Sequence, residues 1–429
     1  MAGSFRWASL VLLLSPIVVS AQEIEATLKN GAHDLKNEVV RVPVQWPGKN
    51  AGLATDGPVA CTVNGTKLVG QLVEPSFVTE TIKPTTGHVR KDLIVVVPSV
   101  KANETLKVAV DPNSKADASA GFSWKDVPGD YSEASYRDSS GKTIPVLRYM
   151  CKTYDTSSPD ARNKTYKVFH HLYDPEGTRY VTNGGHNDPH QTEKDLLYPH
   201  HRGLFFAFNK ITYDGKEADI WHCTKGTHSA HNKTIFETGG PVAADQRVLI
   251  DWVGQKGDVF AQEERQMTVY KVPGGTLVEF ATRLKPLVDK VKLDGDPQHS
   301  GFHFRAANEV SKNNKQTYYL RPDGKGELGA TRNWDPKTKK GPINLPWDVM
   351  SFVLGGKRYS VEYIDSPANP GEKRYSERDY GRFGCYFEYT LTPDHPLLLN
   401  HRIWLQDGEM SADQAIALRE GFVDGPKVQ

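Results

Sequence analysis

The chain has 429 residues, of which 38% are hydrophobic and 24% charged, and its formal net charge is +1. This composition is typical of a globular protein with hydrophobic cores, and the length leaves room for two or three domains of roughly 150 residues each. A net charge so close to zero does not favour nucleic acid or an anionic membrane surface as a partner, so we predict neither.

The first 21 residues have the pattern of a secretory signal peptide. Arg6 supplies a positive charge, an apolar run follows at residues 7–19, and Val19-Ser20-Ala21 fits the small-residue cleavage rule. The apolar run is shorter than the ~20 residues that a membrane-spanning helix needs. We therefore expect an exported protein, periplasmic or extracellular, that is not inserted in a membrane after removal of residues 1–21.

Four cysteines remain after the signal peptide, and an exported protein can form disulfides. Four cysteines allow three pairings, and no C-x-x-C spacing indicates a zinc ribbon. Buried thiols and a structural disulfide both remain open for Cys61, Cys151, Cys223 and Cys385.

Short strands are predicted throughout residues 22–125. Val39–Val44 and Leu93–Val97 are β-branched runs, and Asn64-Gly65 between two such runs is a strong signal for a two-residue hairpin turn. We predict that this region forms an N-terminal β-sandwich.

The next region, from residue 126, continues the strand pattern and introduces histidine. Nine of the fifteen histidines lie between Phe169 and His231. A hairpin with its turn at Asp174-Pro175-Glu176-Gly177 is expected to place His170 and His171 on opposite faces, because side chains alternate along a strand.

Residues 183–199 form a long segment without periodicity, rich in Gly, Asn, Asp and His. Long loops in compact domains are often functional. The segment ends at His200-His201-Arg202-Gly203, directly before Leu204–Phe208. If these residues form one strand, His200 and Arg202 share a face and His201 takes the other.

A second informative strand is predicted at residues 299–305. Alternation places His299, His303 and Arg305 on one face, with Phe302 and Phe304 on the other. One face is thus apolar and the other cationic, which is typical of a strand that lines a polar cleft.

The complete pattern predicts an all-β chain. Residues 126–429 are expected to form a larger antiparallel domain resembling a two-sheet supersandwich. At most one short C-terminal helix is expected, near Ser411 to Glu420, where Ser411 can act as the N-cap.

Four motifs resemble the PmoA-type family of exported bacterial proteins, over roughly residues 145–420. They are the H-H-R-G motif at residues 200–203, the hairpin at His170 to Gly177, the strand at His299 to Arg305, and the segment from Asn369 to Gly384. The family is common in bacteria that degrade glycans. The resemblance implies export and this β domain, and it implies no particular reaction.

The residue types in these segments suit an enzyme that breaks glycans. Cleavage by β-elimination needs a base for the proton next to a carboxyl group, and donors that stabilise the developing enediolate. The predicted catalytic residues are His200, Arg202, His299, His303, Arg305 and Tyr380. The predicted substrate-binding residues are His170, His171, His190, Trp221 and Arg378, with the tryptophan stacking on a sugar ring.

A hydrolase would instead need two carboxylates about 5–10 Å apart. The sequence offers several acids but singles out no pair, so lyase and hydrolase both remain open. The acids considered are Glu193, Asp195, Glu263 and Glu264.

Two further hypotheses concern the same residues. Neutral imidazoles bind divalent metals such as zinc or copper, and the candidate ligands are His186, His190 and His201. Alternatively, the domain binds a small molecule or glycan without chemistry, because a β cleft with aromatic residues can bind sugar without turning it over.

Overall fold

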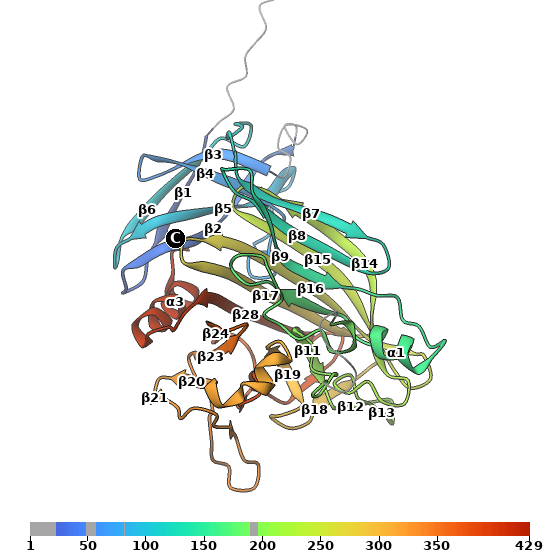
Figure 1. Ribbon diagram of the computed structural model, residues 1–429. Coiled ribbons are helices and arrows are strands. Elements are labelled where there is room, and N and C mark those ends of the chain that lie inside the picture. Colours follow the sequence, from blue (N-terminus) through green and yellow to red (C-terminus); the bar gives the residue numbers. More distant parts are fainter. Residues whose placement is uncertain (1–22, 49–56, 81, 189–195) are drawn as a thin grey trace, which may run out of the picture.

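The computed structural model describes residues 23–48, 57–80, 82–188 and 196–429 (Figure 1). The predicted signal peptide and His190 lie outside these residues. Strands account for 53% of the chain and helices for 8%, which confirms the prediction of an all-β fold.

The N-terminal unit is one seven-stranded antiparallel sheet with its own core of valine and leucine side chains. The hairpin predicted at Asn64-Gly65 is confirmed, and both residues have the positive φ that this tight turn requires (49° and 79°). The predicted boundary near residue 125 falls inside β7 (Gly121–Val127), which belongs to the next sheet. In order across the sheet, the strands are β2 (Leu35–Pro47), β5 (His88–Val100), β4 (Thr66–Val73), β3 (Gly57–Val63), β6 (Thr105–Val110), β1 (Ile24–Lys29) and β29 (Lys427–Val428).

The larger unit contains two nine-stranded antiparallel sheets that enclose the main hydrophobic core. We call the first the site sheet. Its order is β22 (Arg332–Asn333), β25 (Arg374–Arg378), β26 (Arg382–Tyr386), β19 (Ser300–Arg305), β11 (Leu204–Phe208), β10 (Phe169–Leu172), β9 (Thr143–Met150), β8 (Tyr131–Arg137) and β7.

The second sheet, which we call the back sheet, covers the inner face of the site sheet. Its order is β14 (His228–Gly239), β15 (Ala243–Val253), β16 (Val259–Val272), β17 (Gly275–Pro286), β28 (Leu397–Asp407), β24 (Lys357–Asp365), β23 (Asp348–Leu354), β20 (Tyr318–Arg321) and β21 (Gly324–Lys325). A smaller sheet contains β13 (Lys216–Ala218), β12 (Lys210–Tyr213), β18 (Val291–Asp294) and β27 (Tyr389–Leu391).

Alternation along β19 determines which side chains enter the core. Phe302 and Phe304 are buried between the sheets, and the ring of Phe302 stacks on that of Phe280 from the back sheet at 4.0 Å between centroids. His303 and Arg305 therefore lie on the opposite, outer face of the site sheet, as the sequence predicts.

The chain has a C-terminal helix, α3 (Ala412–Asp424), where the sequence predicts one. Ser411 and Gln414 form a reciprocal capping box at its start, which satisfies two backbone N–H groups. Two shorter helices, α1 (Pro159–Thr165) and α2 (Glu309–Lys312), were not predicted, because a helix of one or two turns has no readable period.

Within the described residues, no helix is long and apolar enough to cross a lipid bilayer. All four cysteines are buried free thiols.

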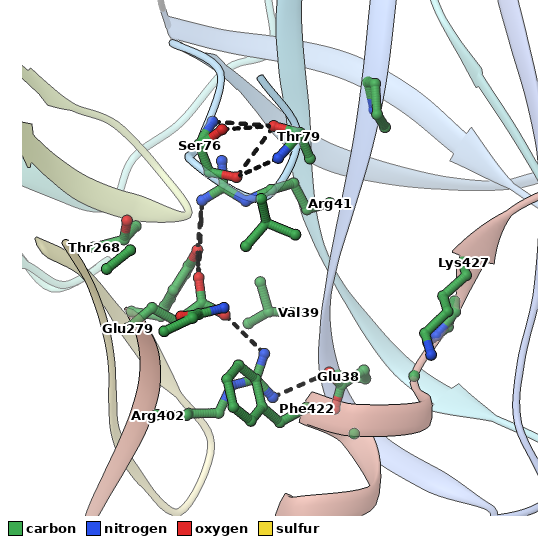
Figure 2. Close-up of a pocket in the computed structure, with 18 of the residues that line it drawn as sticks. Glu38, Val39, Arg41, Ser76, Thr79, Thr268, Glu279, Arg402, Phe422 and Lys427 are labelled. Carbon is green, nitrogen blue, oxygen red and sulfur yellow. Dashed lines mark hydrogen bonds and ion pairs between the residues drawn. The ribbon is translucent and has the colours of Figure 1, made fainter. Parts of the chain in front are cut away.

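A network of paired charges joins the N-terminal sheet to the outer face of the back sheet (Figure 2). Arg402 lies between Glu279, at 2.8 Å, and Glu38 of β2, at 3.4 Å. Arg41 of β2 is 3.1 Å from Asp92 and 3.8 Å from Glu279. The network lines a cavity of about 380 Å³. Because each of these charges already has an opposite partner, we assign the network to holding the two units together.

Candidate functional site

Three partly exposed histidines meet beside the outer face of the site sheet. His200 ends the loop before β11, His222 lies between β13 and β14, and His299 directly precedes β19. The ring centroids of His200 and His222 are 4.7 Å apart, and those of His222 and His299 are 5.1 Å apart. The structure thus brings together three segments that are distant in the sequence, including two predicted catalytic histidines. We call these three residues the histidine cluster.

Two members of the cluster are each held by an aspartate three residues earlier. Nδ1 of His222 is 2.8 Å from Oδ2 of Asp219, and Nδ1 of His299 is 2.9 Å from Oδ1 of Asp296. An Nδ1–H that donates to a carboxylate leaves Nε2 with a free lone pair, which can accept a proton or bind a metal. Both imidazoles are about one-third exposed, at 31% and 33%.

The carboxyl group of Asp296 is in its charged form at neutral pH. Burial by itself would raise its pKa, but the hydrogen bond from His299 and that from the backbone N–H of Gln298 lower the pKa below its ordinary value. Asp296 therefore remains an acceptor that orients the imidazole.

Burial, together with nearby positive charge, keeps the third member of the cluster, His200, neutral. Burial first, and then the positive charge of Lys167, lowers the pKa of His200 to about 2, with smaller effects from His222, His299 and Arg382. His200 can therefore donate or accept one hydrogen bond but does not become an imidazolium at ordinary pH.

Trp221 lies beneath the cluster and is fully buried. Its ring contacts His303 at 4.9 Å, His201 at 5.3 Å and His299 at 6.0 Å between centroids. We predicted that Trp221 stacks on a sugar ring, but in this structure it supports the imidazoles from below and has no exposed face.

His303, predicted to be catalytic, is buried and positions an arginine. Its Nε2–H donates to the carbonyl of Ser300 at 2.9 Å, which leaves Nδ1 to accept from Nη1 of Arg382 at 3.1 Å. Burial and the charge of Arg382 lower the pKa of His303 well below its ordinary value, so its ring stays neutral. Arg382 also donates from Nε to the hydroxyl of Tyr380, at 3.1 Å.

The H-H-R-G motif does not form one strand, and the predicted division of its side chains was wrong. The strand β11 begins only at Leu204, because Gly203 adopts a left-handed conformation (φ 51°). His201 consequently contacts Trp221 and Tyr380 on the cluster side. Arg202 turns away from the cluster.

Arg202 is fully buried and holds backbone atoms of the loop. It donates to the carbonyl oxygens of Pro199, at 3.1 Å, and Asn163, and its guanidinium lies 4.2 Å from the ring centre of Tyr166. These contacts support the loop and do not place the guanidinium at the histidine cluster, where we predicted it.

His170 and His171 lie on opposite faces of β10, as predicted, but both are buried. His170 faces the back sheet, where burial and the charge of Arg265 lower its pKa well below the ordinary value. His171 stacks on Tyr180 at 3.8 Å and its Nδ1 is 3.0 Å from the hydroxyl of Thr182. Neither presents an imidazole to solvent in this structure.

The predicted metal ligands that the structure describes, His186 and His201, do not form a group that could hold an ion. Among the described residues, Asp365, Cys385 and His401 alone have ligand atoms within 4.8 Å of one another, and they lie inside the sandwich. The Asp365 carboxylate there accepts a hydrogen bond from Asn369 at 2.9 Å, and its Oδ1 lies 2.9 Å from Nε2 of His401. His186, on the short helix η2 (Gly185–Asn187), and His201 belong to no such group, and the ring nitrogens of the histidine cluster converge less closely than this limit.

Lys167 lies beneath the cluster, and its lowered pKa can be tested by measuring stability against pH. Its ammonium group donates to the carbonyls of His200, at 3.0 Å, and Trp221, and burial lowers its pKa to about 8. Between about pH 8 and about pH 10.5 the unfolded chain retains a proton that the folded chain has lost, so the free energy of unfolding rises with pH.

We therefore expect the difference in stability between the wild type and Lys167→Met to change with pH. It should shift in favour of the wild type by about 2 kcal/mol between about pH 8 and about pH 9.5, as measured by urea denaturation. The matched variant Lys36→Met, at an exposed position, should show no such change. A constant difference for Lys167→Met would mean that this ammonium group titrates normally.

A family model described as a family of unknown function, DUF6807, matches residues 141–419. The chain belongs to the DUF6807 family. The matched range includes the whole histidine cluster together with Arg378, Tyr380 and Arg382. The resemblance to PmoA-type proteins remains a prediction, and no curated protein matches the chain.

Three solved structures resemble this DUF6807 chain distantly. A protein in the glycosyl hydrolase family 38 from Enterococcus faecalis has a TM-score of 0.38 at 10% identity, covering 94% of this chain and 47% of that one. This chain thus spans about half the length of that protein. A putative aldose 1-epimerase from Klebsiella pneumoniae has a TM-score of 0.29 at 9% identity, with 93% and 94% covered. A putative aldose 1-epimerase from Escherichia coli K12 has a TM-score of 0.23 at 9% identity, with 68% and 100% covered.

Proposed function

We propose that this DUF6807 protein is an exported, carbohydrate-active enzyme of the PmoA type that uses the histidine cluster for proton transfer. The supporting observation is the pair of aspartate-held imidazoles, His222 and His299, whose partly exposed rings lie 5.1 Å apart. One imidazole can remove a proton from a sugar carbon or hydroxyl through the free lone pair of its Nε2, and the imidazolium formed in that step can return the proton to the leaving oxygen.

The carboxylates at the cluster favour β-elimination over hydrolysis. Asp219 and Asp296 are both committed to histidines, so neither is free as a nucleophile or general acid. Glu263 is buried in the back sheet beside Arg265, at 2.7 Å, and Glu264 pairs with Arg283 at 2.8 Å. Of the acids considered from the sequence, these two lie away from the cluster.

The test is a panel of uronate-containing and neutral glycans. We expect turnover of at least one uronate glycan, detected as the ultraviolet absorbance of an unsaturated product. New reducing ends without that absorbance would indicate hydrolysis instead. If no glycan is turned over while affinity is retained, the enzyme proposal fails and a binding protein is the better description.

The binding alternative is supported by an exposed aromatic residue at the edge of the cluster. Tyr198 is 41% exposed, lies 5.0 Å from the ring of Tyr380, and has a left-handed backbone conformation (φ 49°). Such strain is common at ligand sites. Metal analysis of the purified protein separates the remaining alternative, because one equivalent of bound metal per chain would favour a metal enzyme.

A further inference from the structure

Three arginines form a row across neighbouring strands of the site sheet. Arg305 of β19 is the register partner of Arg382 of β26, and Arg382 is the partner of Arg378 of β25. Directly opposed residues in an antiparallel sheet point to the same face, and like charges at such positions repel one another. The guanidinium carbons lie 4.9, 6.0 and 5.6 Å, respectively, from the ring centre of Tyr380. We call these three residues the arginine row.

No carboxylate of the described chain neutralises the row. Arg305 donates to the carbonyls of Ala306 and Tyr380, which are neutral acceptors. Arg382 donates to the His303 ring, to the Tyr380 hydroxyl and to Ser376. Buried charges are ordinarily paired with an opposite charge, so this arrangement has an excess of positive charge that a bound anion would balance.

Arg378 is the member of the row that combines partial exposure with an unused donor. Its side chain is half-buried, and its one hydrogen bond through Nη1, to Oε1 of Gln298, is long at 3.4 Å. Its Nε–H is buried and has no acceptor among the residues that the structure describes. Gln298 directly precedes His299, so the underused guanidinium lies next to the segment that carries the proposed base.

The carboxylates near the cluster are outnumbered by positive groups. Asp219 and Asp296 accept hydrogen bonds from His222 and His299, and neither forms an ion pair with an arginine of the row. Lys167 adds a further amino group from below, without an ion pair to a described carboxylate. The surroundings of the cluster therefore favour a ligand with negative charge and disfavour a bound cation.

We propose that Arg378, supported by Arg382 and Arg305, binds the carboxylate of a uronic acid unit, so that the substrate of the site is an anionic glycan. This inference rests on the proposed function and specifies its substrate. A planar guanidinium matches a carboxylate with two parallel hydrogen bonds. The same carboxylate acidifies the neighbouring C–H group, whose proton His299 is placed to accept.

Calorimetric titration with paired oligosaccharides tests the inference. The probes are galacturonate, mannuronate and glucuronate trisaccharides, each as the free acid and as the methyl ester. A further probe is a trisaccharide without uronic acid that carries a sulfate group. We expect at least one acid to bind about tenfold or more tightly than its own ester, because charge-assisted hydrogen bonds are lost on esterification. Arg378→Gln should abolish that preference.

Arg374→Gln is the matched control for this experiment. Arg374 lies on the same face of the same strand, but it is already paired with Glu372 at 2.9 Å and with Glu388 at 3.0 Å. This variant should retain the preference for the acid.

Each other outcome contradicts a particular claim. Equal affinity of the wild type for every acid and its ester, or no binding of any probe, overturns the inference. Preference that persists in Arg378→Gln overturns the role of Arg378, and tighter binding of the sulfated sugar overturns the choice of carboxylate. Turnover of neutral glycans without charge preference leaves the proposed function intact and removes this inference. Charge-selective binding without turnover keeps the anionic ligand and removes the proposed enzymatic function.

Discussion

Replacing His299 with alanine is expected to lower kcat/KM by about 10²–10⁴-fold on the glycan that the protein turns over. Losses of that size follow removal of a residue that transfers a proton in the transition state. His299 is the strongest candidate because its Nδ1 is fixed by Asp296 and its ring is one-third exposed beside His222. The measurement is steady-state kinetics, with folding checked by circular dichroism.

His395→Ala is the control for this prediction. His395 is exposed in a turn near the C-terminus, where only its backbone bonds to Thr392, and its replacement should leave kcat/KM unchanged. Asp296→Asn should reduce activity less than His299→Ala and should change the pH profile, because a positioning residue acts through the imidazole. Wild-type kinetics in His299→Ala would remove this residue from the mechanism.

Gly301→Ala is expected to destabilise the protein by roughly 3–5 kcal/mol, as measured by chemical denaturation. Gly301 has φ of 100°, which a residue with a Cβ rarely adopts, and an added Cβ would lie 1.9 Å from the carbonyl oxygen of Cys385 on β26. The neighbouring strand would have to move. Because β19 carries His303 and Arg305, the variant should also disturb the arginine row.

A second glycine separates the effect of the positive φ from the effect of the close contact with β26. Gly215 has a similar positive φ of 70°, but nothing lies within 4 Å of the position that its Cβ would occupy. Gly215→Ala should therefore lose only about 1 kcal/mol from backbone strain. If both variants lose the same amount, the close approach of β19 and β26 does not contribute. If Gly301→Ala gives no folded protein while Gly215→Ala does, the prediction holds in its strongest form.

The histidine cluster could have been predicted more completely from the sequence. Asp219 and His222, and likewise Asp296 and His299, have the same D-x-x-H spacing. In both places the aspartate carboxylate contacts the imidazole of the histidine three residues later in the chain. Considering histidines alone, without the acids that hold them, missed Asp219 and Asp296 and left His222 unassigned.

Other residues were misplaced because sequence spacing does not show where a loop changes direction. Alternation was applied through His200–Gly203, but the left-handed conformation at Gly203 interrupts the strand there and turns Arg202 away. Trp221 was assigned to substrate because tryptophan can stack on sugars. Its burial depends on which segments fold over it, and no local pattern reveals that.

The sequence by itself determined the features that depend on neighbouring residues. These are the all-β pattern, the hairpin at Asn64-Gly65, the two faces of β19 and the capped C-terminal helix. Each follows from backbone geometry and side-chain period over a few residues. The tertiary structure alone decided that Arg305, Arg382 and Arg378 share one row, although more than seventy residues separate the first from the other two. Register between distant strands is set by the packing of the whole sheet, because a shift of one residue would move every side chain to the other face.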